Sequence, residues 1–327
     1  MTRSSTIDLT SADYAVTLLA DFIGCKTDNP DGDELALAGR GAPERQPRGA
    51  DPGAGVVGPP NKKRPGGYVF ATFGEPRLLI NVHLDTVPAN TGWSRDPFTA
   101  EITEDRVYGL GSADTKGAMA ALLVALSRVR TRNLAVLFSG DEEAGSEVIR
   151  AFAGSGRLGA IERAIVCEPT RRRGGVRHRG INAYRAHVHG LGGHSSGADH
   201  MPKPVVTMAR LAVAIDEIGQ RHRTAGPDDM RGLCMNVAAL DGGVAFNVVP
   251  DSAALRWSLR PPPEFDMAAL RREFDQAVRA VDPAIEFDQV IEHKPFACRD
   301  PGFYRELLGG FVSDFVPLDF WTEAAVL

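Results

Sequence analysis

The sequence predicts an α/β protein with a mixed, mostly parallel sheet flanked by helices and an inserted ferredoxin-like α+β domain. Two observations predict this fold class. In the first half of the 327-residue chain, apolar strand candidates alternate with helix candidates, which is typical of a parallel sheet covered by helices. After residue 179 the order of candidates changes to β-α-β-β-α-β, which is the ferredoxin-like order.

The first half begins with an amphipathic helix, since Asp13 and Asp21 interrupt the apolar part of residues 1–24. Further along, runs of β-branched and aromatic residues mark strands, and a long apolar helical face follows Asp114. The predicted strands are 66–74, 77–83, 133–139 and 163–170, and the predicted helix is 114–130. Their β-α-β order makes most neighbouring strands of the sheet parallel.

Residues 179–293 form the predicted inserted domain, and residues 1–178 with 294–327 form the domain that carries it. Residues 180–190 alternate between apolar and polar side chains, as expected of a half-exposed strand. His187 and His189 share one face of that strand, and we interpret them as exposed sheet residues rather than as a metal pair. The other predicted elements are helices at 203–219 and 265–280 and strands at 233–240, 252–260 and 285–292.

One segment fits neither domain pattern. Residues 39–67 consist of Gly and Pro to roughly half, far above the ordinary usage of about 12% for the two residues together. They interrupt residues 33–38, which begin like a helix. We expect this segment to lack regular structure, either as a surface insertion or as the product of a compensated frameshift in the gene.

Composition excludes several classes of protein. The net charge of −5 argues against a nucleic-acid surface, and no apolar run approaches the length of a membrane span. The first 24 residues lack a small-residue cleavage site, so they do not resemble a signal peptide. The four cysteines are far apart and form no C-x-x-C pair. We therefore predict no disulfide framework or thiolate zinc site and a location in the reducing cytoplasm.

Polar side chains that suit a metal recur at the ends of the predicted strands. His83 and Asp85 follow one strand, the pair Glu142–Glu143 follows another, and Glu168 ends a third. Asp114 precedes the long helix. Alone, each of these acids would be a helix cap or a solvated charge. Together at one sheet edge they would repel one another without a cation between them, and this donor set suits zinc, cobalt or manganese.

Five motifs occur in order: HLDTVP (83–88), GWSRDPFTAEITEDRVYGLGSADTKG (92–117), DEEAGS (141–146), EPT (168–170) and GLGGHSS (190–196). Together they resemble the zinc amidohydrolases of the aminoacylase, glutamate carboxypeptidase and acetylornithine deacetylase group. The runs WSRDPF, YGLGSADTKG and FWTEA (320–324) are most similar to acetylornithine and acetylcitrulline deacetylases. The resemblance covers nearly the whole chain except 39–67. It implies a zinc-peptidase-like catalytic domain whose inserted domain acts as a lid and forms a homodimer.

The resemblance assigns the metal ligands. His83 and Glu168 would bind one zinc ion, Glu143 would bind the other, and Asp114 would bridge them. Asp85 would fix the tautomer of His83 from behind. Glu142 would be the general base that takes a proton from the metal-bound water and gives it to the departing amine.

The resemblance also assigns residues to the substrate. His194 would stabilise the oxyanion of the tetrahedral intermediate, often from across a dimer interface. Asn247, Arg260 and Glu323 match substrate-binding positions, and the guanidinium of Arg260 suits an α-carboxylate.

The chain departs from the family pattern at its end. The last metal ligand of the family is a histidine downstream of the TEA motif, whereas this chain ends four residues after Glu323. We therefore expect one zinc ion to keep His83, Asp114 and Glu168 and the other to keep only Asp114 and Glu143.

The function implied is hydrolysis of the N-acetyl amide of an amino acid, N-acetylornithine or N-acetylcitrulline, in arginine biosynthesis, with zinc or alternatively cobalt. Within the same family, succinyl-diaminopimelate desuccinylase and a dipeptidase or carboxypeptidase are the alternatives. An alternative of another class is a truncated, non-catalytic remnant that only dimerises or binds one zinc ion.

Overall fold

The computed structural model describes residues 12–41, 51–57, 66–130 and 132–327, with only the backbone path for 38–41 and 51–57. Contacts within the chain divide it into two compact units. The first unit comprises the chain up to Arg171 together with Thr322–Leu327, and the second comprises Arg172–Trp321. The observed crossings therefore lie at 171/172 and 321/322, whereas the sequence predicts them at 178/179 and 293/294.

A five-stranded sheet forms the centre of the first unit, in the order β1-β2-β6-β3-β7. Strand β3 is parallel to both β6 and β7, while β2 is antiparallel to β1 and β6. The sheet is thus mixed, and the predicted α/β class is confirmed. The strands are β1 (Asp51–Val57), β2 (Gly66–Gly74), β3 (Leu78–His83), β6 (Asn133–Ser139) and β7 (Arg163–Val166), with the hairpin β4 (Glu101–Ile102) and β5 (Val107–Tyr108) beside them in the chain.

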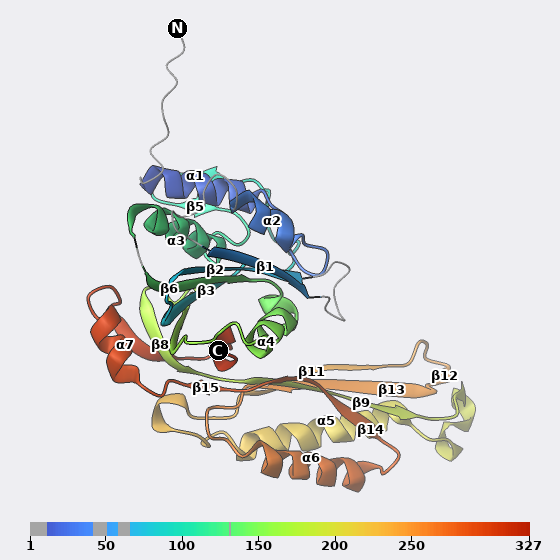
Figure 1. Ribbon diagram of the computed structural model, residues 1–327. Helices are drawn as coiled ribbons and strands as arrows, with labels where there is room; N and C mark the ends of the chain where they lie inside the picture. The colour runs from blue at the N-terminus through green and yellow to red at the C-terminus, as the bar shows by residue number, and fades with distance from the viewer. Residues whose placement is uncertain (1–11, 42–50, 58–65, 131) are drawn as a thin grey trace. The chain divides into compact units, whose positions relative to one another are not determined.

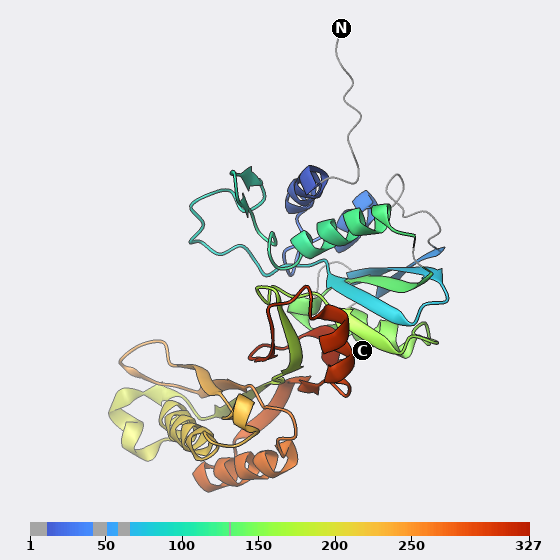
Figure 2. The ribbon, with the colours of Figure 1, turned by 90° about the vertical axis from the view of Figure 1, so that its left-hand side faces the viewer.

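Helices cover both faces of this sheet (Figures 1 and 2). On one face, α1 (Ala12–Ile23) and α3 (Lys116–Arg128) pack their buried residues against those of the sheet. On the other face, α4 (Glu147–Gly154) packs Val148, Ile149 and Phe152 against the sheet. Because β3 and β6 lie between two helical layers, their apolar runs are buried on both sides, which explains the absence of polar alternation in the sequence.

The expectation that residues 39–67 lack regular structure is wrong for part of the segment. Helix α2 (Glu34–Gly41) extends into it, β2 begins at its last two residues, and β1 pairs antiparallel with β2 over its full length. The pairing uses backbone groups, so a Gly-rich sequence can form it, and Pro52 is tolerated because β1 is an edge strand. Residues 42–50 and 58–65 of the segment lie outside the described residues.

The second unit contains the predicted ferredoxin-like domain. Its antiparallel sheet has the order β11-β13-β9-β14, as a β-α-β-β-α-β chain gives when it folds in this way. Helices α5 and α6 cover one face and bury Tyr184, Trp257 and Phe274 between helices and sheet (Figure 2). The elements are β9 (Ile181–His189), α5 (Pro204–Arg221), β11 (Met235–Gly242), β13 (Ser252–Leu259), α6 (Met267–Val281) and β14 (Glu286–His293).

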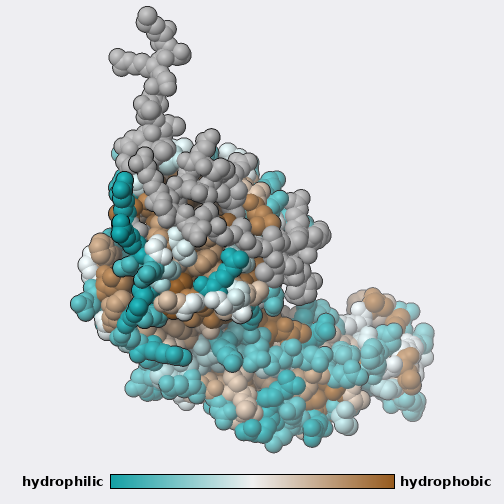
Figure 3. Space-filling view, in the orientation of Figure 1, coloured by the Kyte–Doolittle hydropathy of each residue, from teal (hydrophilic) through white to brown (hydrophobic). Residues whose placement is uncertain are grey.

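A small sheet completes the second unit. Strand β8 (Arg173–His178) lies between β15 (Phe296–Ala297) and β16 (Asp314–Leu318), and α7 (Pro301–Leu308) connects these two. In the view of Figure 3, mainly hydrophilic residues cover the second unit. None of the helices in the described part of the chain has the length and apolar character needed to cross a membrane.

Candidate active site

His83 is the last residue of β3 and is buried, with 3% of its surface exposed. Its Nδ1 lies 3.0 Å from the carbonyl oxygen of Asp85, which can only accept, so Nδ1 carries the hydrogen. Nε2 is the ring nitrogen that faces Asp114, and it donates to Oδ1 of that carboxylate at 3.0 Å. Because Nδ1 is committed to the backbone, Nε2 is the nitrogen that would bind a metal ion once it has lost its hydrogen.

Asp114 is held beside His83 by its neighbour in the chain. The hydroxyl of Thr115 donates a 2.7 Å hydrogen bond to the carbonyl oxygen of His83, which fixes the start of α3 against the end of β3. The Asp114 side chain remains 47% exposed. It can thus contact both His83 and a ligand that arrives from solvent.

The two glutamates Glu142 and Glu143 lie in a short 3₁₀ turn (Glu142–Ala144) directly after β6. Their backbone N–H groups donate to the carboxylate of Asp85, from Glu142 to Oδ1 and from Glu143 to Oδ2, each at 3.0 Å. Asp85 is completely buried. Its carboxylate therefore fixes the turn, while its contact with His83 Nδ1 is longer, at 3.5 Å. 

Burial and, after it, repulsion between neighbouring carboxylates raise the pKa values of the acidic side chains at this end of the sheet. Burial and the charges of Glu168, Glu323 and Asp85 raise the pKa of Glu142 well above its usual value. Burial and the charge of Asp114 raise the pKa of Glu143 to about 7.

The same neighbouring charges shift the pKa values of Glu168 and His83. Burial, followed by the charge of Asp114, raises the pKa of Glu168 to about 8. Burial alone would lower the pKa of His83, but hydrogen bonds to Asp114 and Asp85 raise it well above its usual value. A bound cation would offset the repulsion within this cluster, because it would stabilise each of these carboxylates in its charged form.

Glu323 adds a further buried carboxyl group behind the turn. It is 1% exposed, and the hydroxyl of Ser139 donates to its Oε2 at 2.6 Å, while Asn81 donates to the Ser139 hydroxyl at 2.8 Å. Burial raises the pKa of Glu323 to about 7. In this structure the carboxyl group faces the protein interior, and the predicted role in substrate binding stays a prediction.

The described residues contain one group of three side chains that could hold a metal ion, namely His83, Asp114 and Glu143. Their ligand atoms lie within 4.8 Å of one another. Glu168 is the fourth predicted ligand, and its buried Oε1 has no hydrogen-bond partner among the described residues. Glu168 lies outside the group of three. One imidazole with the carboxylates of Asp114 and Glu143 forms a donor set that fits zinc, so the residues present fit the metal that the sequence predicts.

His194 and Asn247 lie close together in the second unit. The two-residue strand β10 (Gly193–His194) pairs with β12 (Val248–Val249), and the N–H of Ser195 donates to the carbonyl oxygen of Asn247 at 3.0 Å. His194 Nδ1 accepts from the N–H of Ser196 at 3.2 Å, which leaves the hydrogen on Nε2. His194 is exposed, so Nε2–H can donate to an oxyanion.

Arg260 is not brought to the same place. It follows the last residue of β13, whereas Asn247 lies five positions before the first residue of that strand, with β12 between them. The eight residues of the extended strand β13 span about 27 Å. The structure therefore unites His194 with Asn247 but not with Arg260 within one chain.

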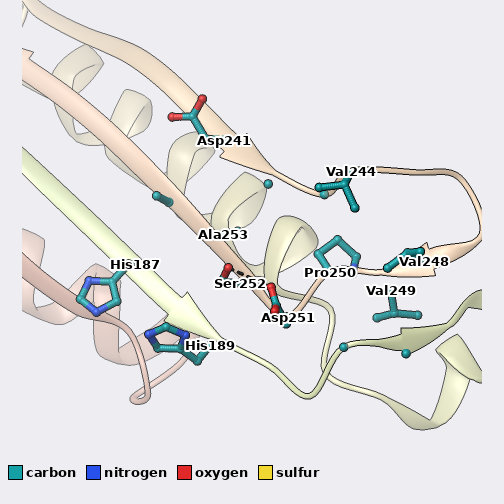
Figure 4. A pocket seen from close by; sticks show the side chains of 15 residues that line it. His187, His189, Asp241, Val244, Val248, Val249, Pro250, Asp251, Ser252 and Ala253 are labelled. Carbon is teal, nitrogen blue, oxygen red and sulfur yellow. Dashed lines mark hydrogen bonds between the residues drawn. The ribbon is translucent and has the colours of Figure 1, made fainter.

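A cavity of about 700 Å³ lies at the end of the second unit's sheet (Figure 4). His187 and His189 line it next to each other on β9, together with Asp251 and Ser252 at the start of β13. His187 Nε2 is 3.0 Å from a carboxylate oxygen of Glu286. His187 is half-buried and His189 is exposed, so their interpretation as sheet residues without a metal stays a prediction.

A match to a known protein family covers most of the chain. The model of peptidase family M20/M25/M40 matches residues 79–313, which is more than half of the chain. The chain belongs to this family. Membership of this family makes it a metal-dependent hydrolase, as its motifs and its cluster of ligands indicate.

The chain is similar to individual members of the family. It is 35% identical to N-acetyl-L-citrulline deacetylase of Xanthomonas campestris pv. campestris, over 79% of this chain and 72% of that protein. It is 30% identical to succinyl-diaminopimelate desuccinylase of Gluconobacter oxydans, over 86% and 76%. The fold matches an M20 family metallo-carboxypeptidase from Sulfolobus solfataricus with a TM-score of 0.71 at 16% identity, covering 95% and 87% of the two chains.

Sequence reasoning missed two side chains that the structure places at the site. Asn29 donates to Asp85, and Glu34 accepts from the backbone of Asp141. Both lie in the polar segment DNPDGDE (28–34), which leads into the helix start at 33–38. Their only signal was the presence of polar residues between an apolar helix and a second helix start, which is also typical of an exposed loop.

Proposed function

We propose that this chain hydrolyses the N-acetyl amide of an amino acid, N-acetylcitrulline or N-acetylornithine, to acetate and the free amino acid. The observation that carries the proposal is the joint position of His83, Asp114 and Glu143 beside Glu142 in a chain 35% identical to an N-acetyl-L-citrulline deacetylase. A place in arginine biosynthesis follows from this substrate and is proposed with it.

His83, Asp114, Glu143 and Glu168 would hold zinc, or cobalt in its place. The metal would supply Lewis acidity, which lowers the pKa of a bound water and polarises the acyl oxygen. The residues around it prepare the ligands: the Asp85 carbonyl sets the tautomer of His83, and the Asp85 carboxylate fixes the turn that carries Glu143. 

Glu142 would transfer the proton. It precedes the ligand Glu143 in the same 3₁₀ turn, and its backbone is fixed by Asp85. Burial and neighbouring carboxylates raise its pKa, which makes its carboxylate form a stronger base than that of an exposed glutamate. As the carboxylate, Glu142 would accept a proton from water, and the resulting carboxylic acid would deliver that proton to the nitrogen of the departing amine.

The substrate-side residues support a homodimer. An N-acetyl amino acid is no longer than about three residues of extended chain, about 10 Å. Asn247 lies before the start of β13 and Arg260 follows its end, so the two cannot both contact this substrate from one chain. If both bind substrate, they come from two copies, which is the arrangement that a dimer through the second unit would provide.

Substrate identity is tested by a kinetic panel. Acetate or succinate release is measured from N-acetylcitrulline, N-acetylornithine and N-succinyl-diaminopimelate with zinc or cobalt added. The proposal expects the N-acetyl substrates to have kcat/KM values at least about tenfold above that of the succinyl substrate, because the succinyl carboxylate would enter a cluster that already repels negative charge. A preference for the succinyl substrate would instead favour the desuccinylase, which the similarity to the Gluconobacter oxydans protein supports.

A second candidate function is metal binding without catalysis. It is favoured by the single group of three ligand side chains in the described part of the chain. Metal analysis of the purified protein separates the two candidates. Two tightly bound ions per chain with acetate release support the hydrolase, and one ion without acetate release supports the non-catalytic protein.

A further inference from the structure

Three successive backbone amides of the turn after β6 donate to buried carboxylates. The N–H of Asp141 donates to Glu34 Oε1 at 3.1 Å, and the N–H groups of Glu142 and Glu143 donate to Asp85. Glu34 is 2% exposed, and Asp85 is completely buried. The turn that carries both functional glutamates is therefore held by two carboxylates that are remote from it in sequence.

Asn29 in turn holds Asp85. Its side-chain Nδ2 donates to Asp85 Oδ2 at 2.7 Å, and Asn29 is 7% exposed. The same Oδ2 accepts the N–H of Glu143. Asn29 thus adds a second donor to the oxygen that fixes the Glu143 backbone.

The segment that supplies Asn29 is itself anchored to the site. Lys116, two residues after Asp114, donates from Nζ to the carbonyl oxygen of Cys25 at 2.9 Å. The N–H of Asn29 donates to Thr86, and the N–H of Thr86 donates to Thr27. Segment 25–34 therefore meets the site at fixed backbone contacts rather than as a loose connection.

We propose that Asn29 and Glu34 are positioning residues for the turn at 141–143. Asn29 acts through Asp85 on the backbone of Glu142 and Glu143, and Glu34 acts directly on the backbone of Asp141. This inference deepens the proposed function and rests on it for its catalytic consequence. The geometric part, the control of the turn, does not depend on any metal or substrate.

The identity of each residue suits this role. An amide is the one side chain of this size that offers a donor to Asp85 without adding a charge. Asn29→Asp keeps the shape but places a second carboxylate 2.7 Å from Asp85 Oδ2. Glu34→Ala removes the acceptor for Asp141 and leaves Asp85 untouched.

The test is hydrogen exchange of the metal-free protein, resolved to single amides by fragmentation mass spectrometry. Asn29→Asp should speed exchange at Glu142 and Glu143 by about tenfold or more and leave Asp141 unchanged. Glu34→Ala should do the reverse. Thr27→Val is the matched control, because Thr27 is equally buried in the same segment and its hydroxyl has no partner among the described residues. It should leave all three amides unchanged.

Catalysis and metal binding give the second readout. Asn29→Asp should weaken zinc binding, measured by calorimetric titration, by about 10- to 100-fold and lower kcat with KM changed less than about threefold. Asn29→Ala, which adds no charge, is measured beside it in case the aspartate variant does not fold. In an Asp85→Ala background, Asn29→Ala should have no further effect, because Asn29 acts only through Asp85.

The inference is overturned if exchange at 142 and 143 in both Asn29 variants equals that of the wild type, or if Thr27→Val changes it equally. A different result would contradict the proposed function. A wild-type protein that releases no acetate from any N-acetyl substrate would remove the proposed function, while the exchange comparison would still decide the role of Asn29 and Glu34.

Discussion

Replacing Glu323 by Gln should remove a pH-dependent loss of stability. Glu323 is 1% exposed, and it is hydrogen-bonded to two neutral groups, the hydroxyl of Ser139 and the side-chain amide of Asn81. A glutamine keeps the acceptor for Ser139 and removes the charge. The substitution therefore tests the electrostatic cost of the carboxylate cluster without creating a cavity.

The magnitude follows from the pKa of Glu323. Burial raises it from 4.5 to about 7 in the folded protein. The folded form then binds the proton more tightly than the unfolded form, so the free energy of unfolding falls as the pH rises from 4.5 to about 7. At about 1.4 kcal/mol per pH unit, the loss is about 3 kcal/mol, complete above pH 7.

The assay is urea unfolding of the metal-free protein at pH 5 and pH 8.5. The wild type and Glu323→Gln should have free energies of unfolding within about 1 kcal/mol of each other at pH 5. At pH 8.5 the variant should be more stable by about 3 kcal/mol. Glu75→Gln, at an exposed position of the same unit, is the control and should follow the wild type at both values. If Glu323→Gln shows the same pH dependence as the wild type, the buried carboxyl group is not the source of the strain and the reasoning fails.

Three further predictions follow from the site and the fold. Chelation of the metal should lower the Tm, because a ligand at a hundred times its Kd stabilises the folded state by about 2.7 kcal/mol, and zinc should restore the Tm whereas magnesium should not. His194→Ala should lower kcat by about 10²- to 10³-fold with metal content unchanged; an unchanged kcat would exclude the oxyanion role. Trp257→Ala should reduce stability by about 3–5 kcal/mol in urea unfolding, since this 1%-exposed indole stacks on Tyr184 at 5.3 Å; a loss below 1 kcal/mol would contradict the core assignment of the second unit.

Several regular elements could be predicted because each leaves a local pattern. The alternation of residues 180–190 gave β9, and the long apolar face after Asp114 gave α3. The sequence did not predict α4, β8, α7 or β16, nor β1, where Gly and Pro hide a strand that pairs along the open edge of β2. Backbone pairing of this kind leaves no periodicity to detect.

The sequence predicted which residues of the site lie at strand ends, but not the hydrogen bonds that hold them in place. His83, Glu142, Glu143 and Glu168 follow strands, so their convergence was expected from the α/β topology. The contacts that fix them join distant residues: Asn29 and Asp85 are 56 positions apart, and Ser139 and Glu323 are 184 apart. No local sequence pattern predicts such a long-range partner. In the sequence, a buried polar residue of a loop cannot be distinguished from an exposed one.

If this cluster binds a metal and hydrolyses an N-acetyl amide with Glu142 as the base, loss of the Glu142 carboxylate should slow the reaction without removing the metal. The rate of acetate release from N-acetylcitrulline is therefore measured for zinc-loaded wild type and zinc-loaded Glu142→Ala. We expect equal zinc content and a rate about 10²- to 10⁴-fold lower for the variant. An equal rate in the two proteins, or no release from the zinc-loaded wild type, would contradict it.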